Sequence, residues 1–119
     1  MAGLPTNVEM IDPIVWVSNL TRAVTYYTEV LGFHAAGWST EDFTSVSFGG
    51  HGIYLAQQQQ GQAGSWLWIG VGDVRALHEF FAARAATIRL PPTSYPWALE
   101  LHVEDPDGNV LRFGSDPDD

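Results

Sequence analysis

An internal repeat constrains the fold of this 119-residue chain more than any other sequence feature. An offset of 54 residues (71 minus 17) pairs Asn19 with Asp73, and both residue types favour the first position of a helix. The same offset pairs the tyrosines at 26–27 with the phenylalanines at 80–81. Each stretch carries apolar residues at helical spacing, which predicts one buried helix face. The expected buried positions are Ala23, Val24, Tyr27, Val30 and Leu31 in the first helix and Val74, Leu77, Phe81 and Ala85 in the second. Gly32 is expected to end the first helix in a left-handed conformation.

Segments typical of strands flank both predicted helices. They cover residues 11–17, 43–48 and 53–56 around the first helix, and 65–71, 87–90, 97–103 and 110–113 around the second. The prolines at 91–92 are expected to interrupt the strand that starts at Thr87. The sequence therefore predicts an α+β fold of two tandem βαβββ modules, which form a curved mixed sheet around a concave pocket with the helices outside. We expect a single domain over residues 1–119, with module one at 8–56, a polar linker at 57–64 and module two at 65–115.

Composition narrows the classes of partner. Five basic residues, all arginine, stand against fourteen acidic ones, for a formal net charge of -9. Such a chain repels phosphate backbones and anionic lipid, so we expect neither nucleic acid nor a membrane as partner. The chain has no cysteine, and the sequence offers no signal peptide or membrane span, so a cytoplasmic location is expected.

Alternation in the last strands predicts a polar cluster. Leu99, Leu101 and Val103 alternate with Glu100, His102 and Glu104, so one set should pack on the helix and the other should face the cavity or solvent. Arg112 is expected on the adjoining strand, where Glu100 or His102 could pair with it. Trp66 and Trp68 lie two residues apart in one predicted strand and should share a face, as a core layer or as a stacking wall. The four histidines are dispersed and show no metal-ligand spacing.

Two segments carry a family resemblance that spans nearly the whole chain. Residues 23–33 (AVTYYTEVLGF) and 103–113 (VEDPDGNVLRF) resemble the glyoxalase/bleomycin-resistance/dioxygenase superfamily, also called vicinal oxygen chelate proteins. The resemblance implies either a metal-dependent enzyme or a metal-free protein that sequesters an antibiotic. The positions that correspond to metal ligands in the enzymes are occupied by Asp12, Tyr54, Trp66 and Arg112. Only Asp12 among them readily binds a divalent cation, so neither a metal nor another cofactor is expected.

The resemblance is closest to the bleomycin-binding branch of the family. It implies that Trp97 and Phe43 sandwich a planar ligand. The ligand is expected to be cationic, because Glu41, Asp42, Glu100 and the net charge would attract it. The expected ligand-binding residues are Phe43, Tyr54, Trp66, Trp97, Glu100, His102 and Arg112. The function predicted from this resemblance is non-catalytic sequestration of a bleomycin-type antibiotic. The alternative is a glyoxalase-like lyase or dioxygenase-related enzyme, with Arg112, His102 or Glu100 in an acid–base role. A homodimer is expected because an open sheet needs a cover. The resemblance implies exchange of an N-terminal arm at Pro13, and the alternative for this residue is an ordinary proline at a strand edge.

Overall fold

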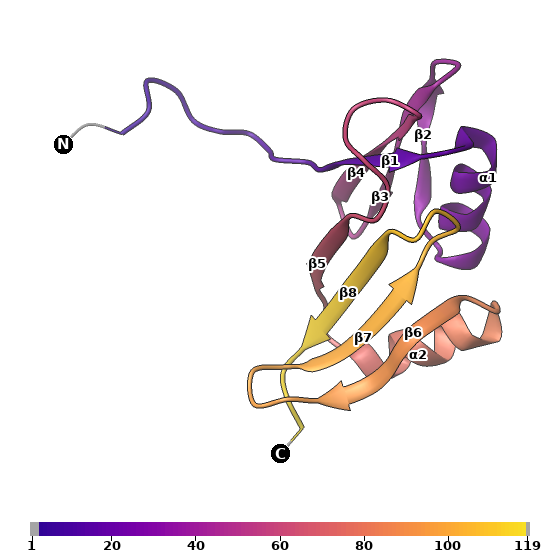
Figure 1. The fold of residues 1–119 in the computed structure, drawn as a ribbon. Helices are drawn as coiled ribbons and strands as arrows, with labels where there is room; N and C mark the ends of the chain where they lie inside the picture. Colours follow the sequence, from indigo (N-terminus) through magenta and orange to yellow (C-terminus); the bar gives the residue numbers. More distant parts are fainter. Residues whose placement is uncertain (1–2, 119) are drawn as a thin grey trace.

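The computed structural model describes residues 3–118 and contains two four-stranded sheets, one in each module (Figure 1). Module one comprises β1 (Ile14–Val17), α1 (Leu20–Thr25), the π-helical turn η1 (Tyr26–Val30), β2 (His34–Ser39), β3 (Phe43–Phe48) and β4 (His51–Gln57). Module two comprises β5 (Trp66–Gly70), α2 (Val74–Ala83), β6 (Thr87–Ser94), β7 (Leu99–Glu104) and β8 (Val110–Ser115). The strand orders, β1-β4-β3-β2 and β5-β8-β7-β6, are equivalent. The predicted duplication of a βαβββ unit is thus confirmed.

The register within each sheet decides which side chains share a face. In both modules the first strand runs parallel to the last, and this places Ile14 beside Tyr54 and Trp68 beside Arg112. The other neighbours are antiparallel, and His102 lies opposite Arg112. Because successive side chains point to opposite faces of a strand, Trp66, Trp68, Arg112 and His102 all project from one face of the second sheet. We call the face of each sheet that its helix does not cover the open face.

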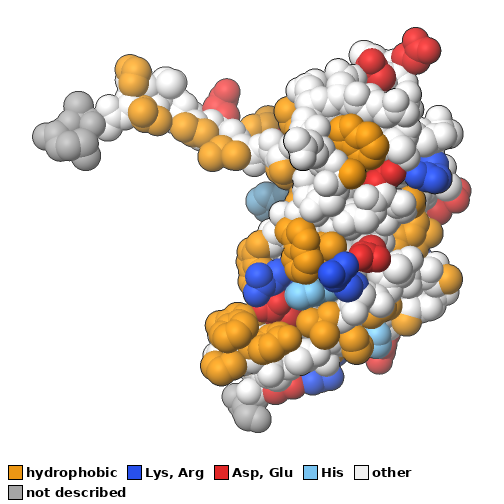
Figure 2. All heavy atoms as spheres, viewed as in Figure 1, with side chains coloured by type: hydrophobic (Ala, Val, Ile, Leu, Met, Phe, Trp, Pro, Cys, Tyr) orange, Lys and Arg blue, Asp and Glu red, His pale blue; other side chains and the backbone are white. Residues whose placement is uncertain are grey.

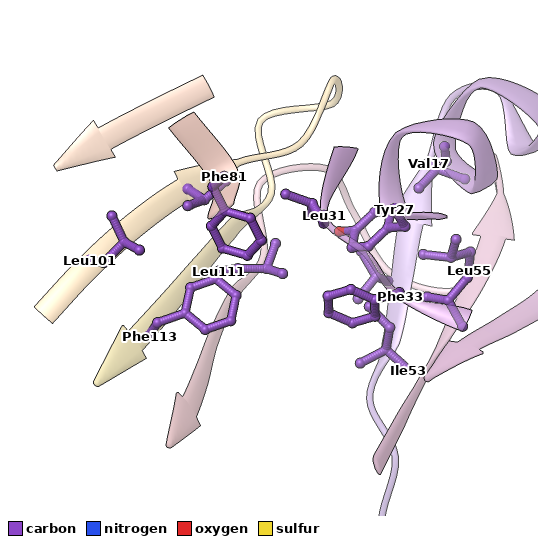
Figure 3. Packing of buried hydrophobic residues seen from close by; sticks show 14 of the residues in the cluster. Val17, Tyr27, Leu31, Phe33, Ile53, Leu55, Phe81, Leu101, Leu111 and Phe113 are labelled. Atoms are coloured by element: carbon purple, nitrogen blue, oxygen red, sulfur yellow. The ribbon is translucent and has the colours of Figure 1, made fainter. Parts of the chain in front are cut away.

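Each helix packs on the face of its own sheet that lies opposite the open face, and the two modules together bury one continuous hydrophobic core (Figure 3). Asn19 and Asp73 cap α1 and α2 through their side chains, as the repeat predicts. Tyr27 and Phe81, paired by the repeat, are both fully buried. Gly32 has a φ of +79°, and a Cβ there would lie 2.8 Å from the ring of Phe80, so backbone conformation and close packing both call for glycine.

The β-turn between β7 and β8 joins module two to module one. The hydroxyl of Tyr27 donates to Asp105 Oδ2 over 2.9 Å, and the hydroxyl of Tyr26 donates to the carbonyl of Glu104 over 2.7 Å. Asn109 Nδ2 donates to the carbonyl of Trp16 over 2.9 Å. These bonds between buried or partly buried groups fix the orientation of one sheet relative to the other.

Several expected boundaries differ from the structure. The prolines at 91–92 do not interrupt the strand, since β6 runs to Ser94 with two register shifts. Because β6 is an edge strand, a missing N–H on its outer side needs no partner, and the register shift between Leu90 and Thr93 interrupts the pairing with β7 where the other proline lies. Ala85 lies beyond the end of α2 with a φ of +58° and is exposed, so it does not belong to the buried helix face. The predicted strands at 97–103 and 11–17 begin too early, because β7 starts at Leu99 and β1 at Ile14.

The chain before β1 extends away from both sheets as an arm, here defined as residues 3–13 (Figures 1 and 2). It carries large apolar side chains, among them Met10, which is 67% exposed, and Ile11, which is 88% exposed. None of the helices described between residues 3 and 118 is long and apolar enough to cross a membrane.

Candidate functional site

Three aromatic side chains cluster on module one. Phe43 and Tyr54 stack with ring centroids 5.3 Å apart and an interplanar angle of 15°. Trp38 stacks on Phe43 at 6.1 Å and lies 6.4 Å from Tyr54. Phe43 alternates with the buried Thr44, and Tyr54 alternates with Ile53 and Leu55 of the core, so the first two rings lie on the open face. We call Trp38, Phe43 and Tyr54 the module-one cluster.

Module two presents a larger aromatic surface. Trp66 is 53% exposed, Trp68 is 55% exposed and Trp97 is 62% exposed, so these indoles are a surface rather than a core layer. Trp97 stacks on Tyr95 with centroids 4.9 Å apart and an interplanar angle of 3°. Two arginines add cation–π contacts, with Arg89 Cζ 5.2 Å from the Trp66 centroid and Arg112 Cζ 5.2 Å from the Trp68 centroid.

A single buried carboxylate connects the polar residues of this surface. Glu100 is 1% exposed and accepts two hydrogen bonds on each oxygen. Oε1 accepts from His102 Nε2 at 2.8 Å and from Arg112 Nε at 2.6 Å. Oε2 accepts from Trp97 Nε1 at 2.6 Å and from Arg112 Nη2 at 2.8 Å. Because a carboxylate only accepts, the proton of His102 resides on Nε2. We call Glu100, Trp97, His102 and Arg112 the Glu100 cluster.

The protonation of Glu100 follows from these partners. Hydrogen bonds from the Arg112 guanidinium are the largest cause that lowers the pKa of Glu100, and His102 and Trp97 add to it. Burial opposes them, but the pKa still falls from 4.5 to about 2. The same contact raises the pKa of Arg112. Glu100 and Arg112 are therefore a charged pair at neutral pH, and neither suits acid–base chemistry there.

The structure brings the seven candidate residues into two groups. Phe43 and Tyr54 belong to the module-one cluster. Trp66, Trp97, Glu100, His102 and Arg112 lie together on module two, and Trp66 meets His102 edge to face at 5.5 Å. A hollow of about 440 Å³ lies between Trp68 and Trp97, and Gly114 forms part of its lining. The lining of this hollow does not include Phe43.

The donor set does not fit a metal ion at the family's positions. Arg112 directs its guanidinium at Glu100, so the nearest carboxylate is already neutralised. Trp66 offers no lone pair, and Asp12 is placed instead beside Gly52, near a different groove. Within the described part of the chain, no three or more His, Cys, Asp or Glu side chains are grouped as metal ligands.

Four further side chains lie beside these two groups but are not among the seven expected ligand-binding residues. Trp38 lies in β2, a strand that is not among those the sequence predicts. Tyr95 stacks under Trp97, and the Tyr-Pro-Trp spacing at 95–97 was an available signal. Trp68 shares a face with Trp66, and that spacing predicted it. Arg89 reaches Trp66 and pairs with Glu104 at 2.5 Å, which no sequence pattern indicated.

A family model describes residues 10–113 as "Glyoxalase/Bleomycin resistance protein/Dioxygenase superfamily". Since the match includes both modules and most of the chain, this protein belongs to that superfamily. The resemblance read from residues 23–33 and 103–113 is thereby confirmed. A search of curated proteins finds no match.

Solved structures share the whole fold. TnmS3, an antibiotic binding protein from Streptomyces sp. CB03234, has a TM-score of 0.81 and 21% identity, with 95% of this chain and 99% of that chain covered. The bleomycin-binding protein of Streptomyces verticillus, solved with copper(II)-bleomycin, has a TM-score of 0.76 and 24% identity, with 92% and 98% covered. A virulence protein from Salmonella typhimurium has a TM-score of 0.76 and 21% identity, with 93% and 99% covered. At these identities the likeness establishes the fold alone.

Proposed function

We propose that this protein binds and sequesters a planar small molecule, such as a bleomycin-type antibiotic, without chemical change to it. The observation that carries the proposal is the exposed aromatic surface of module two, formed by Trp66, Trp68 and Trp97. Exposed indoles on one sheet face are costly to leave in water, and they suit a flat ring that stacks on them. Two of the structural neighbours are proteins that bind an antibiotic or bleomycin, which supports this choice of ligand.

The charge distribution supports a cationic group on the ligand. Glu41 and Asp42 are exposed and immediately precede Phe43, at the edge of the module-one cluster. Together with the formal net charge of -9, they would attract a cation and accelerate its arrival. Glu100 does not contribute to this attraction, because Arg112 already balances its charge.

We also propose that the complete site forms between two copies of the chain. Phe43 and Trp97 belong to different modules, so the proposed ligand would lie where module one of one protomer meets module two of its partner. The root of the arm, with Asp12 and Pro13, borders a groove of about 690 Å³ whose other wall includes residues 67–72 of the edge strand β5 and the loop after it. Unpaired edge strands and exposed apolar residues both favour association, so a second copy is the proposed occupant, with arm exchange at Pro13.

Titration with metal-free bleomycin tests the function. Saturable quenching of tryptophan fluorescence is expected, and mass spectrometry should recover the bleomycin unchanged after incubation. An absence of quenching at tens of micromolar ligand would refute the bleomycin assignment. A modified product would instead support the enzyme alternative.

Light scattering after size-exclusion chromatography tests the assembly. The wild-type chain should elute as a dimer, and the double variant Met10→Asp/Ile11→Asp should be a monomer because it places charge on the apolar arm. Thr6→Asp adds charge to the same arm without loss of an apolar side chain, and it should remain dimeric. A dimer that survives the double variant would contradict arm exchange.

A further inference from the structure

The buried carboxylate of Glu100 has no free acceptor position for a ligand. Its two oxygens accept four hydrogen bonds, which matches the roughly four lone-pair sites of a carboxylate. It is also 1% exposed, beneath side chains that are themselves exposed. A residue in this position acts through its neighbours. Glu100 therefore affects a ligand through the position in which it holds Arg112.

Arg112 keeps one nitrogen free. Its Nε and Nη2 are engaged by Glu100, whereas Nη1 has no hydrogen-bond partner within residues 3–118. The side chain is 38% exposed, and its guanidinium lies against the indole of Trp68. Two bonds to one carboxylate, together with an aromatic contact, fix the plane of the guanidinium. The free nitrogen is thus a fixed donor beside an aromatic surface.

The charges around this donor are balanced. Arg112 is paired with Glu100, and the neighbouring Arg89 is paired with Glu104. Figure 2 shows that basic side chains flank an apolar patch on this face, with acidic groups close by. Because Glu100 already balances the charge of Arg112, an anionic ligand would gain little electrostatic attraction there and would still lose its hydration. A neutral oxygen can accept the same hydrogen bond at a smaller cost of desolvation.

We propose that Glu100 is a specificity-determining residue, which fixes Arg112 so that the site selects planar aromatic ligands bearing a neutral carbonyl oxygen over ligands bearing an anion. Arg112 Nη1 donates to the carbonyl while the ring stacks on the tryptophans of module two. The inference rests on the aromatic binding of the proposed function, but it does not depend on bleomycin as the ligand.

Two fluorescent probes of similar ring size test the selection. Prodan carries a carbonyl on a naphthalene, and its emission shifts to the red when that carbonyl accepts a hydrogen bond. Anilinonaphthalene sulfonate carries an anion instead. The wild-type protein should bind Prodan more tightly than the sulfonate, and bound Prodan should emit further to the red than it does on a variant that lacks the Arg112 donor. Glu100→Gln should weaken Prodan and strengthen the sulfonate, each by about tenfold, because it leaves Arg112 mobile and uncompensated.

Two further variants separate this effect from a general loss of structure. Glu79→Gln removes an exposed carboxylate from α2, on the other side of the sheet, and should leave the ratio of the two dissociation constants unchanged. Glu100→Gln/Arg112→Gln replaces the charged pair by two neutral side chains, so bound Prodan should emit further to the blue than on wild type, without a gain in sulfonate affinity. Equal weakening of both probes in Glu100→Gln, an unchanged ratio, or no Prodan binding by wild type would overturn the inference. Failure of the bleomycin titration alone would overturn only the choice of antibiotic.

Discussion

Replacement of Glu100 by glutamine should destabilise the fold in a pH-dependent way. The folded-state pKa of about 2 against an ordinary value of 4.5 corresponds to about 3 kcal/mol that favours the ionised carboxylate in the fold. Glutamine retains the shape but brings an NH₂ group among donors, and Arg112 loses its counter-charge. Since Arg112 is 38% exposed and can turn to water, we expect a loss of about 2 kcal/mol in the free energy of unfolding at pH 7, or roughly 10 °C in Tm.

The pH dependence has a definite sign. Because the pKa of Glu100 is lower in the folded than in the unfolded chain, its contribution is fully present above pH 4.5 and is lost as the pH falls through about 2. Protonated Glu100 resembles glutamine, so wild type and Glu100→Gln should converge in acid. By about pH 3 the difference should fall to less than half of its value at pH 7.

Urea denaturation followed by circular dichroism measures this difference at a fixed protomer concentration, because a dimer's stability depends on concentration. Glu104→Gln is the matched control, since its pair with Arg89 is partly exposed and should contribute at most about 1 kcal/mol. The reasoning would be refuted if Glu100→Gln were no less stable than Glu104→Gln at pH 7. It would also fail if the difference from wild type were the same at pH 3 and pH 7.

Two other predictions concern close contacts. A Cβ at position 114 would lie 2.2 Å from the Trp68 ring, so Gly114→Ala should displace that indole and lower the free energy of unfolding by about 1 kcal/mol. Gly72→Ala places its Cβ in open space and should leave the free energy of unfolding unchanged. Urea curves that give the two variants equal stability would contradict this packing. Tyr27→Phe removes a buried hydrogen bond to Asp105, a carboxyl whose pKa is raised mainly by burial. The free energy of unfolding should fall by about 1–3 kcal/mol in the same assay. A fall of less than about 0.5 kcal/mol would mean that the bond does not join the modules as described.

Much of the fold could be predicted from local signals. Asn19 and Asp73 cap their helices by bonds to N–H groups three residues later, and Gly32 adopts the left-handed conformation that follows a helix. Because these signals are local, the sequence indicates the helix ends directly. The alternation around Leu101 places Glu100 and His102 on the same face of β7, where one of them was expected to pair with Arg112. The structure confirms that Glu100 pairs with Arg112. These features depend on periodicity and neighbouring residues, which a single sequence contains.

The features that the sequence did not indicate depend on tertiary context. The prolines at 91–92 would break a central strand, but β6 lies at the edge of its sheet, and edge position is a property of the assembled fold. The π-helical turn over Tyr26–Val30 continues α1 directly, and the spacing of buried residues over one turn does not distinguish it from an α-helix. That Glu100 would be buried under its partners, rather than exposed to a ligand, follows from the packing of Trp97 and Arg112 over it.

Complementation between two impaired variants tests most directly whether planar ligands bind between module one of one protomer and module two of its partner. Phe43→Ala and Trp97→Ala should each bind metal-free bleomycin weakly in calorimetric titration, because each removes one side of the proposed stack. Dimers reassembled from an equal mixture should regain wild-type affinity at one site per mixed dimer, since one of the two sites then has both aromatic residues. If the mixture binds no better than either variant alone, the site does not span two protomers.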